Sequence, residues 1–150
     1  MPKKILFVCT GNTCRSPMAA ALLRKMASEA GLSLEVQSAG IAAFLGVPAT
    51  HEAIEVSREQ GLDLSSHQSQ PLSKPLVVES DLILTMTAKH RETILRKMPQ
   101  IEDKVFVFSE FAGMGTEDVE DPVGQDETVY RKVLGQMADY ARNILPKLGD

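Results

Sequence analysis

Cysteine is scarce in this 150-residue sequence, and both cysteines, Cys9 and Cys14, lie in one short segment near the N-terminus. A small secreted scaffold held together by disulfides needs more cysteines, spread along the chain. We therefore expect these two residues to serve chemistry rather than the framework.

Long apolar runs and an excess of basic charge are also missing. No run approaches the roughly 18 residues that span a bilayer, and residues 1–4 lead into an expected strand without the apolar core of a signal peptide. The net charge of -4 argues against a nucleic-acid-binding surface, which normally shows a basic patch. The sequence thus predicts a cytoplasmic protein that binds neither membranes nor nucleic acids.

The composition that remains is that of a globular protein, with 43% hydrophobic and 24% charged residues, and it predicts one domain over residues 1–150. Four short apolar segments predict strands, and each is followed by a helical pattern. This alternation predicts an α/β fold, a three-layer sandwich around a four-stranded parallel sheet. The expected strands are 5–8, 34–38, 81–86 and 104–108, and the expected helices are 16–30, 50–59, 87–98 and 126–145.

The segment KILFVCTGNTCRSPM, residues 4–18, carries the main chemical signal. A buried strand runs into Cys9, turn-forming residues follow, and Ser16 with Pro17 predicts a helix start, with Ser16 as the N-cap and Pro17 as the first helical residue. Cys9 is then expected at the carboxyl end of a strand, facing a helix N-terminus, with Arg15 in the same loop. Ligands of parallel sheets bind at such strand ends.

This loop has the features of a phosphate-binding loop. A glycine-containing turn before a helix points backbone N–H groups at an anion, and Arg15 adds a bidentate fork. The same positive field favours the thiolate of Cys9, and an anionic nucleophile in a phosphate cradle indicates attack on phosphorus through a phosphocysteine. Ser16 is placed to donate a hydrogen bond to the sulfur. The expected binding residues are Thr10, Gly11, Asn12, Thr13, Cys14 and Ser16.

Such a reaction needs a general acid to protonate the leaving group. Asp121 is the first candidate because it precedes Pro122, which restricts its backbone, and because it lies in a long acidic loop. Glu117, Asp118 and Glu120 in the same loop remain alternatives.

Other chemistries fit the loop less well. A zinc site would need two ligands besides the cysteines, and the three histidines lack metal-ligand spacing, so no metal is expected. The loop matches neither G-x-G-x-x-G nor the lysine-containing P-loop of NTPases. Two alternatives stay open: a thiol redox sensor using Cys9 and Cys14, whose spacing permits a disulfide, and a non-catalytic phosphate-binding module.

The motifs VCTGNTCRSP and DPVG, with SAG at 38–40, SSHQSQ around His67 and SDLILTM between them, resemble the low-molecular-weight protein tyrosine phosphatase family over essentially the whole chain. The resemblance implies phosphorylated proteins as partners, a monomer, and no metal or organic cofactor. It also implies Cys9 as nucleophile, Arg15 as phosphate clamp and Asp121 as general acid. The residues it implies as a supporting hydrogen-bond network are Asn12, Ser16, Ser38 and His67.

Two positions depart from the tyrosine-specific members of that family. Thr13 stands where those members carry an aliphatic residue, and Val123 stands where an aromatic residue follows the Asp-Pro pair. Both tyrosines, Tyr130 and Tyr140, are expected in the last helix, away from the rim of the site. The GNTCRSPMA form resembles the bacterial branch that dephosphorylates arginine, and a hydroxyl at position 13 can pair with a guanidinium group. The sequence predicts a protein arginine phosphatase, with a tyrosine phosphatase carrying a neutral Thr13 as the alternative.

Overall fold

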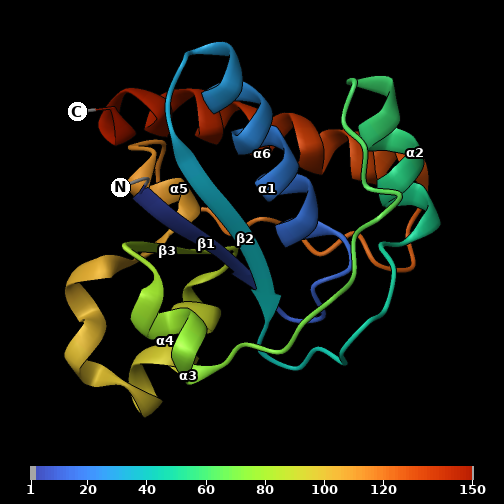
Figure 1. The fold of residues 1–150 in the computed structure, drawn as a ribbon. Helices are drawn as coiled ribbons and strands as arrows, with labels where there is room; N and C mark the ends of the chain where they lie inside the picture. Colours follow the sequence, from blue (N-terminus) through green and yellow to red (C-terminus); the bar gives the residue numbers. More distant parts are fainter. Residues whose placement is uncertain (1–2, 150) are drawn as a thin grey trace.

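A parallel sheet of four strands runs through the middle of the molecule in the order β2-β1-β3-β4 (Figure 1). The computed structural model describes residues 3–149, and Met1, Pro2 and Asp150, at the ends of the predicted domain, lie outside the described residues. Helices cover both faces of the sheet, so the predicted three-layer α/β sandwich is confirmed. The strands are β1 (Lys3–Cys9), β2 (Leu34–Gly40), β3 (Leu82–Thr85) and β4 (Val105–Val107).

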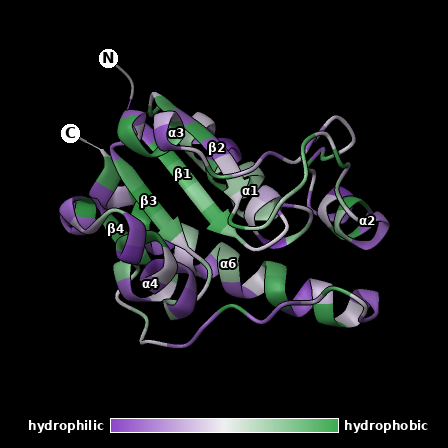
Figure 2. Cartoon of the chain, turned by 90° about the horizontal axis from the view of Figure 1, so that it is seen from below, coloured by the Kyte–Doolittle hydropathy of each residue, from purple (hydrophilic) through white to green (hydrophobic). Residues whose placement is uncertain are grey.

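The central strand β1 explains why its sequence is apolar without alternation. Phe7 and Cys9 belong to the hydrophobic core on one face of the sheet, and Leu6 and Val8 belong to the core on the other face. A strand covered on both faces has no side that benefits from polar residues. Figure 2 shows β1 and β3 as hydrophobic strands between helices whose outer sides are hydrophilic.

The helices divide between the two faces. Helices α1 and α6 pack against each other and contribute to the larger core, while α3 and α4 supply Val77 and Ile94 to the smaller one. No helix among residues 3–149 is long and apolar enough to cross a membrane. The helices are α1 (Arg15–Glu29), α2 (His51–Glu59), α3 (Lys74–Glu79), α4 (Ala88–Lys97), α5 (Phe108–Phe111) and α6 (Glu127–Leu148), with a 3-10 helix η1 (Pro99–Lys104).

The start of α1 corrects the sequence analysis. The helix begins at Arg15 after Cys14, which makes no side-chain cap, so the predictions of Ser16 as N-cap and Pro17 as first helical residue are wrong. The Ser16 hydroxyl bonds to the Cys9 sulfur and to the Asn12 amide instead of to a backbone N–H group. The Ser16 side chain therefore binds atoms of the loop and does not cap the helix.

Three short helical segments were not predicted. Helix α3 forms in a segment with two prolines, Pro71 and Pro75. Pro75 occupies the first turn, where a missing N–H group costs nothing, and the Ser73 hydroxyl caps the helix. The segments η1 and α5 flank the short strand β4. Helix α6 also continues past the expected residue 145, since Leu148 is buried in the core.

The carboxyl ends of the strands converge on one edge of the sheet. Cys9 pairs in register with Gly40 at the end of β2, and Met86, just after β3, donates its N–H to the Val8 carbonyl. The N-terminus of α1 follows within a few residues of Cys9. The fold therefore brings the predicted loop, two neighbouring strand ends and a helix start together.

Candidate active site

Cys9 lies at the end of β1 and is 2% exposed, and its sulfur has two hydrogen-bond partners, Asn12 and Ser16. The Asn12 N–H donates to Cys9 Sγ at 3.3 Å, and Ser16 Oγ lies 2.8 Å from the sulfur. Asn12 Nδ2 donates to Ser16 Oγ at 2.8 Å, which leaves the serine hydroxyl hydrogen to point at the sulfur. Two donors are therefore aimed at one sulfur.

Asn12 fixes the shape of the loop. It is fully buried and is the one non-glycine residue with a positive φ, 58°, among the described residues. Its Nδ2 also donates to Ser38 Oγ at 2.9 Å, its Oδ1 accepts the Gln70 N–H at 2.9 Å, and its carbonyl accepts from His67 Nε2 at 2.8 Å. The residues Asn12, Ser16, Ser38 and His67 therefore share one network, which Gln70 extends. Burial lowers the pKa of His67, so the ring is neutral at pH 7.

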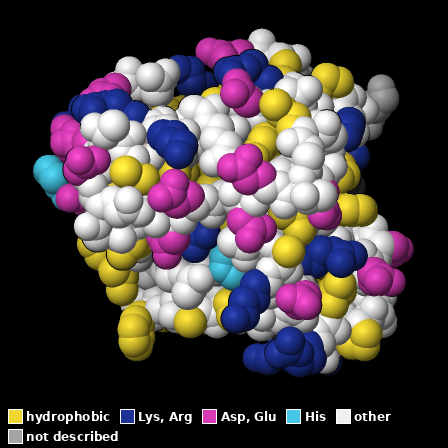
Figure 3. All heavy atoms as spheres, turned by 180° about the vertical axis from the view of Figure 1, so that it is seen from behind, with side chains coloured by type: hydrophobic (Ala, Val, Ile, Leu, Met, Phe, Trp, Pro, Cys, Tyr) yellow, Lys and Arg dark blue, Asp and Glu magenta, His cyan; other side chains and the backbone are white. Residues whose placement is uncertain are grey.

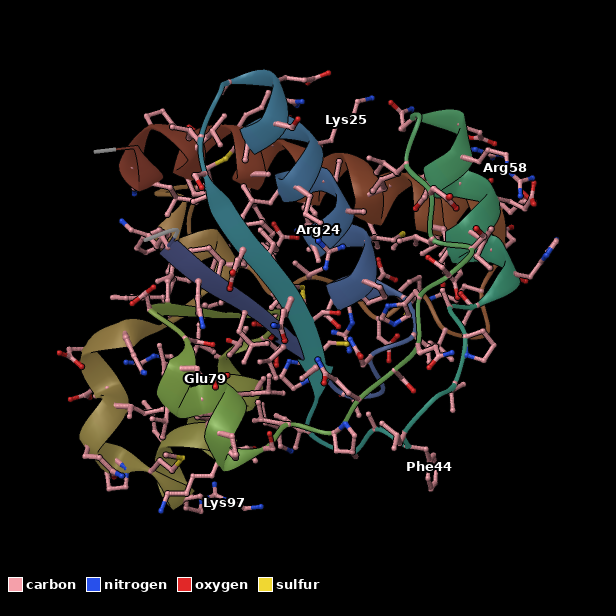
Figure 4. The ribbon with its side chains drawn as sticks, viewed as in Figure 1. Arg24, Lys25, Phe44, Arg58, Glu79 and Lys97 are labelled. Atoms are coloured by element: carbon pink, nitrogen blue, oxygen red, sulfur yellow. The ribbon has the colours of Figure 1, made fainter. Side chains whose placement is uncertain are left out.

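The end of β2 lies directly against the back of the loop. Ile41 and Ala42 donate their N–H groups to the carbonyls of Cys9 and Thr10, each at 2.9 Å. A Cβ atom at Gly40 would stand 2.5 Å from the Thr10 carbonyl oxygen, so only glycine fits there. Segment 41–48 continues from this point, and its Phe44 is 81% exposed and projects away from the body of the molecule (Figure 4).

Arg15 joins the loop to the acidic loop 113–126. Its guanidinium is buried; Nη1 donates to the Val119 carbonyl at 3.0 Å, and Nη2 lies 3.6 Å from Asp121 Oδ2. The Nε atom is buried without a hydrogen-bond partner among the described residues. An unpaired N–H of a buried cation is costly, and a phosphate-class oxyanion is the kind of ligand that would satisfy it.

Asp121 is the acidic residue that approaches both Arg15 and Cys14. Its side chain is 50% exposed, its Oδ1 accepts the Val123 N–H at 3.1 Å, and the same oxygen is 3.9 Å from Cys14 Sγ. The carboxylate thus borders the site and retains access to water. This position suits a group that exchanges protons with a ligand and with solvent.

The structure separates Asp121 from its sequence alternatives. Asp118 Oδ1 accepts the Ala88 N–H at 2.9 Å, so this carboxylate binds the start of α4. Glu120 Oε1 lies 3.9 Å from Lys132 Nζ of α6. Glu117 is exposed.

Cys14 differs chemically from Cys9 although both are buried and neither forms a disulfide. Burial, with the nearby Cys9 and Asp121 acting in the same direction, raises the pKa of Cys14 to about 12. At neutral pH this residue is therefore a thiol.

Thr13 presents a half-buried side chain whose hydroxyl forms no hydrogen bond with residues 3–149, and its carbonyl accepts the Thr50 N–H at 2.9 Å. Thr50 Oγ1 in turn donates to Tyr130 Oη at 3.1 Å. Tyr130 is buried, and burial raises its pKa. Sequence analysis placed this tyrosine correctly in the last helix but missed that it supports the loop through Thr50, since no local pattern joins residues 80 positions apart.

His90 of α4 is a second residue that the sequence did not identify. Its Nε2 lies 2.9 Å from Thr10 Oγ1, and its side chain is buried. Burial is the main cause that lowers its pKa to about 4; Arg15 acts in the same direction, while Asp118 and Asp121 oppose it. The ring is therefore neutral at pH 7.

On one face of the molecule the surface charges are mixed in sign. The face turned away in Figure 1 carries acidic and basic side chains interspersed, with several acidic ones near its centre (Figure 3). Within residues 3–149, no group of three or more His, Cys, Asp or Glu side chains is placed to hold a metal ion. Anion binding at the loop would depend on local N–H groups and Arg15.

Comparison with known proteins gives consistent matches over the chain. The family model of the low molecular weight phosphotyrosine protein phosphatases matches residues 4–150. A protein-arginine-phosphatase of Bacillus subtilis (strain 168) is 38% identical over 144 residues, covering 96% of this chain and 95% of the relative. The low molecular weight protein-tyrosine-phosphatase Wzb of Escherichia coli (strain K12) is 41% identical over 108 residues, 72% of this chain and 71% of the relative.

A solved structure agrees with this match. It is a cysteine-to-serine mutant of the YwlE arginine phosphatase with a phosphorylated active site serine, and it superposes with a TM-score of 0.93. It shares 37% identity and covers 97% of this chain and 95% of its own.

Proposed function

Since the chain belongs to the low-molecular-weight phosphotyrosine protein phosphatase family, we propose that it is a protein arginine phosphatase. It hydrolyses phosphoarginine in proteins through a phosphocysteine on Cys9, as a cytoplasmic monomer without a metal or organic cofactor. The observation that carries the proposal is the Thr13 hydroxyl, half-buried in the loop of the nucleophile and unpaired within the described part of the chain.

In the first step, the Cys9 thiolate attacks phosphorus while the phosphoryl oxygens bind the loop N–H groups and Arg15. The P–N bond breaks, and the protonated Asp121 carboxyl gives its proton to the departing guanidine nitrogen. The phosphoryl oxygens bind the Arg15 guanidinium in place of Asp121, which lies 3.6 Å from it in the free protein. The Asp121 side chain is then free to face the leaving group.

In the second step, the Asp121 carboxylate takes a proton from a water molecule that attacks the phosphocysteine. The P–S bond breaks, phosphate leaves, and Cys9 returns to the thiolate. The donors from Asn12 and Ser16 stabilise the sulfur as a leaving group, as they stabilise it as a nucleophile. The solved relative with a phosphorylated active site serine supports an intermediate on this side chain.

Preference for arginine follows from polar pairing at the rim. A guanidinium carries several N–H donors, and the Thr13 hydroxyl and the carbonyl oxygen of the Asp121 carboxyl can accept from them. An aliphatic residue at position 13 would leave a donor unpaired, which a site can use to discriminate strongly. Val123 is 54% exposed and offers no ring for a phosphotyrosine to stack on.

A tyrosine phosphatase is the second candidate, and Phe44 favours it. This exposed aromatic side chain lies two residues after Ala42, whose N–H donates to the Thr10 carbonyl, so it is the aromatic residue of that segment that a phosphotyrosine ring could contact. The 41% identity to Wzb supports the same alternative, so overall similarity does not choose between the two substrates.

The deciding experiment is phosphate release from matched phosphoarginine and phosphotyrosine peptides by the parent and by Thr13→Ile. We expect the parent to prefer phosphoarginine, and Thr13→Ile to lower the ratio of the two kcat/KM values by about tenfold or more. Thr128→Ile, at an exposed position of α6, is the matched control and should leave the ratio unchanged. A parent that prefers phosphotyrosine would replace the proposal by the second candidate, and release from any substrate would exclude a non-catalytic phosphate-binding module.

We also propose that the redox chemistry open to two cysteines in one loop regulates the phosphatase rather than being its function. A redox sensor alone would have no use for the buried Arg15 or for the Asp121 carboxylate beside it. Cys14 would then be the redox partner of Cys9.

A further inference from the structure

The hydrogen bond between His90 and Thr10 joins α4 to the residue that directly follows the nucleophile. His90 Nε2 lies 2.9 Å from Thr10 Oγ1, while the His90 residue is 8% exposed and the Thr10 residue is exposed. The Thr10 side chain is thus at the mouth of the site, and a buried ring from another element holds it from behind.

The second ring nitrogen determines the direction of this hydrogen bond. His90 Nδ1 is buried and has no partner among the described residues. A hydrogen on Nδ1 would be an unpaired buried donor, whereas a bare acceptor lone pair is tolerated better in protein interiors. The neutral ring therefore carries its hydrogen on Nε2, which donates to Thr10 Oγ1.

This direction fixes what the threonine hydroxyl can do. Its oxygen is occupied as an acceptor on the side of His90, so its own hydrogen points away from the ring, toward the opening. The charges that face His90 from other elements are Arg15 at the start of α1 and Asp118 and Asp121 in the acidic loop. With burial, Arg15 keeps the ring neutral, so His90 orients Thr10 without adding a cation that would pair with Asp121.

We propose that His90 is a positioning residue for phosphoryl transfer, which holds the Thr10 hydroxyl so that it donates a hydrogen bond to an oxygen of the bound phosphoryl group. The inference rests on the proposed function only in that a phosphoryl group binds at this loop. It does not depend on whether that group comes from arginine or tyrosine. Thr10 is then the residue that touches the substrate, and His90 acts through it.

The test measures the Kd of inorganic phosphate by calorimetry, with KM and kcat on an aryl phosphate, for four variants. We expect His90→Leu and Thr10→Val each to weaken phosphate binding and to raise KM by roughly three- to tenfold, the loss of one hydrogen bond. His90→Gln should restore binding to within about threefold of the parent, because its amide nitrogen can donate to Thr10 Oγ1 from a similar reach. The double variant His90→Leu/Thr10→Val should bind phosphate no more weakly than the weaker-binding of the two single variants, since each single substitution removes the same hydrogen bond.

The matched control is His51→Gln on the exposed start of α2, which should leave both constants unchanged. Multiplying effects in the double variant, or a His90→Gln variant as weak as His90→Leu, would overturn the proposal and leave His90 a packing residue. A fall in Tm without any change in Kd would do the same. Phosphate binding separates this test from the arginine proposal: a parent inactive on phosphoarginine sinks the latter alone, and the calorimetric comparison still decides the role of His90.

Discussion

At the scale of single residues, the two cysteines of one loop have different surroundings. The Cys9 sulfur accepts from the Asn12 N–H and lies 2.8 Å from the Ser16 hydroxyl oxygen. The pKa of Cys14 is raised to about 12 by burial and by the negative charges of Cys9 and Asp121. One sulfur thus accepts hydrogen bonds from its loop, and the other is kept protonated by its surroundings.

This difference leads to a prediction about oxidation. Peroxide converts the Cys9 thiolate to a sulfenic acid and leaves hydroxide; the Cys14 thiol then displaces water to form a disulfide that added thiol reduces. Loss of the Cys9 charge removes one cause of the raised Cys14 pKa, which helps this second step. We expect Cys14→Ala and Cys14→Ser, after a peroxide pulse, to regain a several-fold smaller share of their own untreated activity than the parent.

The accompanying measurement is the mass of the peptide that contains Cys9, which should show sulfinic acid in the two variants and the disulfide in the parent. If Cys14→Ala recovers under thiol as fully as the parent, Cys14 is not the redox partner.

At the scale of elements, the loop is held by backbone segments that approach it closely. The end of β2 passes so near that a Cβ atom at Gly40 would lie 2.5 Å from the Thr10 carbonyl oxygen and 3.0 Å from the Asn12 nitrogen. Both contacts are with backbone atoms, which cannot rotate out of the way as a side chain can. The position of the Cys9 loop therefore depends on a glycine in a neighbouring strand.

We expect Gly40→Ala to lower kcat/KM by about tenfold or more through displacement of the loop, and the free energy of unfolding by roughly 1–3 kcal/mol through overpacking. Gly135→Ala in α6 is the control, because a Cβ there meets nothing within 4 Å. This control should stabilise the helix by about 0.5–1 kcal/mol and leave kcat/KM unchanged. Urea unfolding and steady-state kinetics on both variants measure these effects, and a fully active Gly40→Ala would show that the loop tolerates the shift.

Elements whose signals are local were predictable from the sequence. Thr50 and Thr87 accept from backbone N–H groups as N-caps of α2 and α4, as their positions before helical patterns indicate. The apolar run of β1 identified the central strand, and the spacing of Cys9 and Arg15 identified the loop. In each case the residues of the sequence pattern are the same residues that form the cap, the strand or the loop.

Contacts between distant parts of the chain could not be predicted in this way. Arg15 Nη1 binds the carbonyl of Val119, 104 residues away, and a carbonyl is present at every residue, so the sequence holds no sign of it. The pairing of Thr10 with His90 spans 80 residues and depends on how α4 packs against the sheet. The fold has to be known before such partners can be named.

At the scale of the whole molecule, the packing of α4 and of the segment between α2 and α3 buries two histidines, His90 and His67. This burial keeps both rings neutral at pH 7. His90 and His67 both have a pKa below the ordinary value of 6.5, and burial is the first cause for each. The carboxyls with lowered pKa, Glu59 and Asp63, have ordinary values of 4.5 and 3.8, so their effect on stability falls at lower pH. The histidine contribution can therefore be measured above pH 5.

Between pH 6.5 and about 4 the unfolded chain binds a proton at position 90 that the folded protein does not. The free energy of unfolding therefore decreases as the pH is lowered through this window, and it is fully restored above pH 6.5. Between pH 7 and pH 5, we expect the free energy of unfolding of His90→Gln to fall by about 1–2 kcal/mol less than that of the parent. This figure includes a reduction for solvent screening at a partly hydrated site. His51→Gln, at an exposed position, should follow the parent. Urea unfolding at the two pH values measures the difference, and equal losses in the parent and in His90→Gln would mean that His90 accepts a proton as readily in the folded protein as in the unfolded chain.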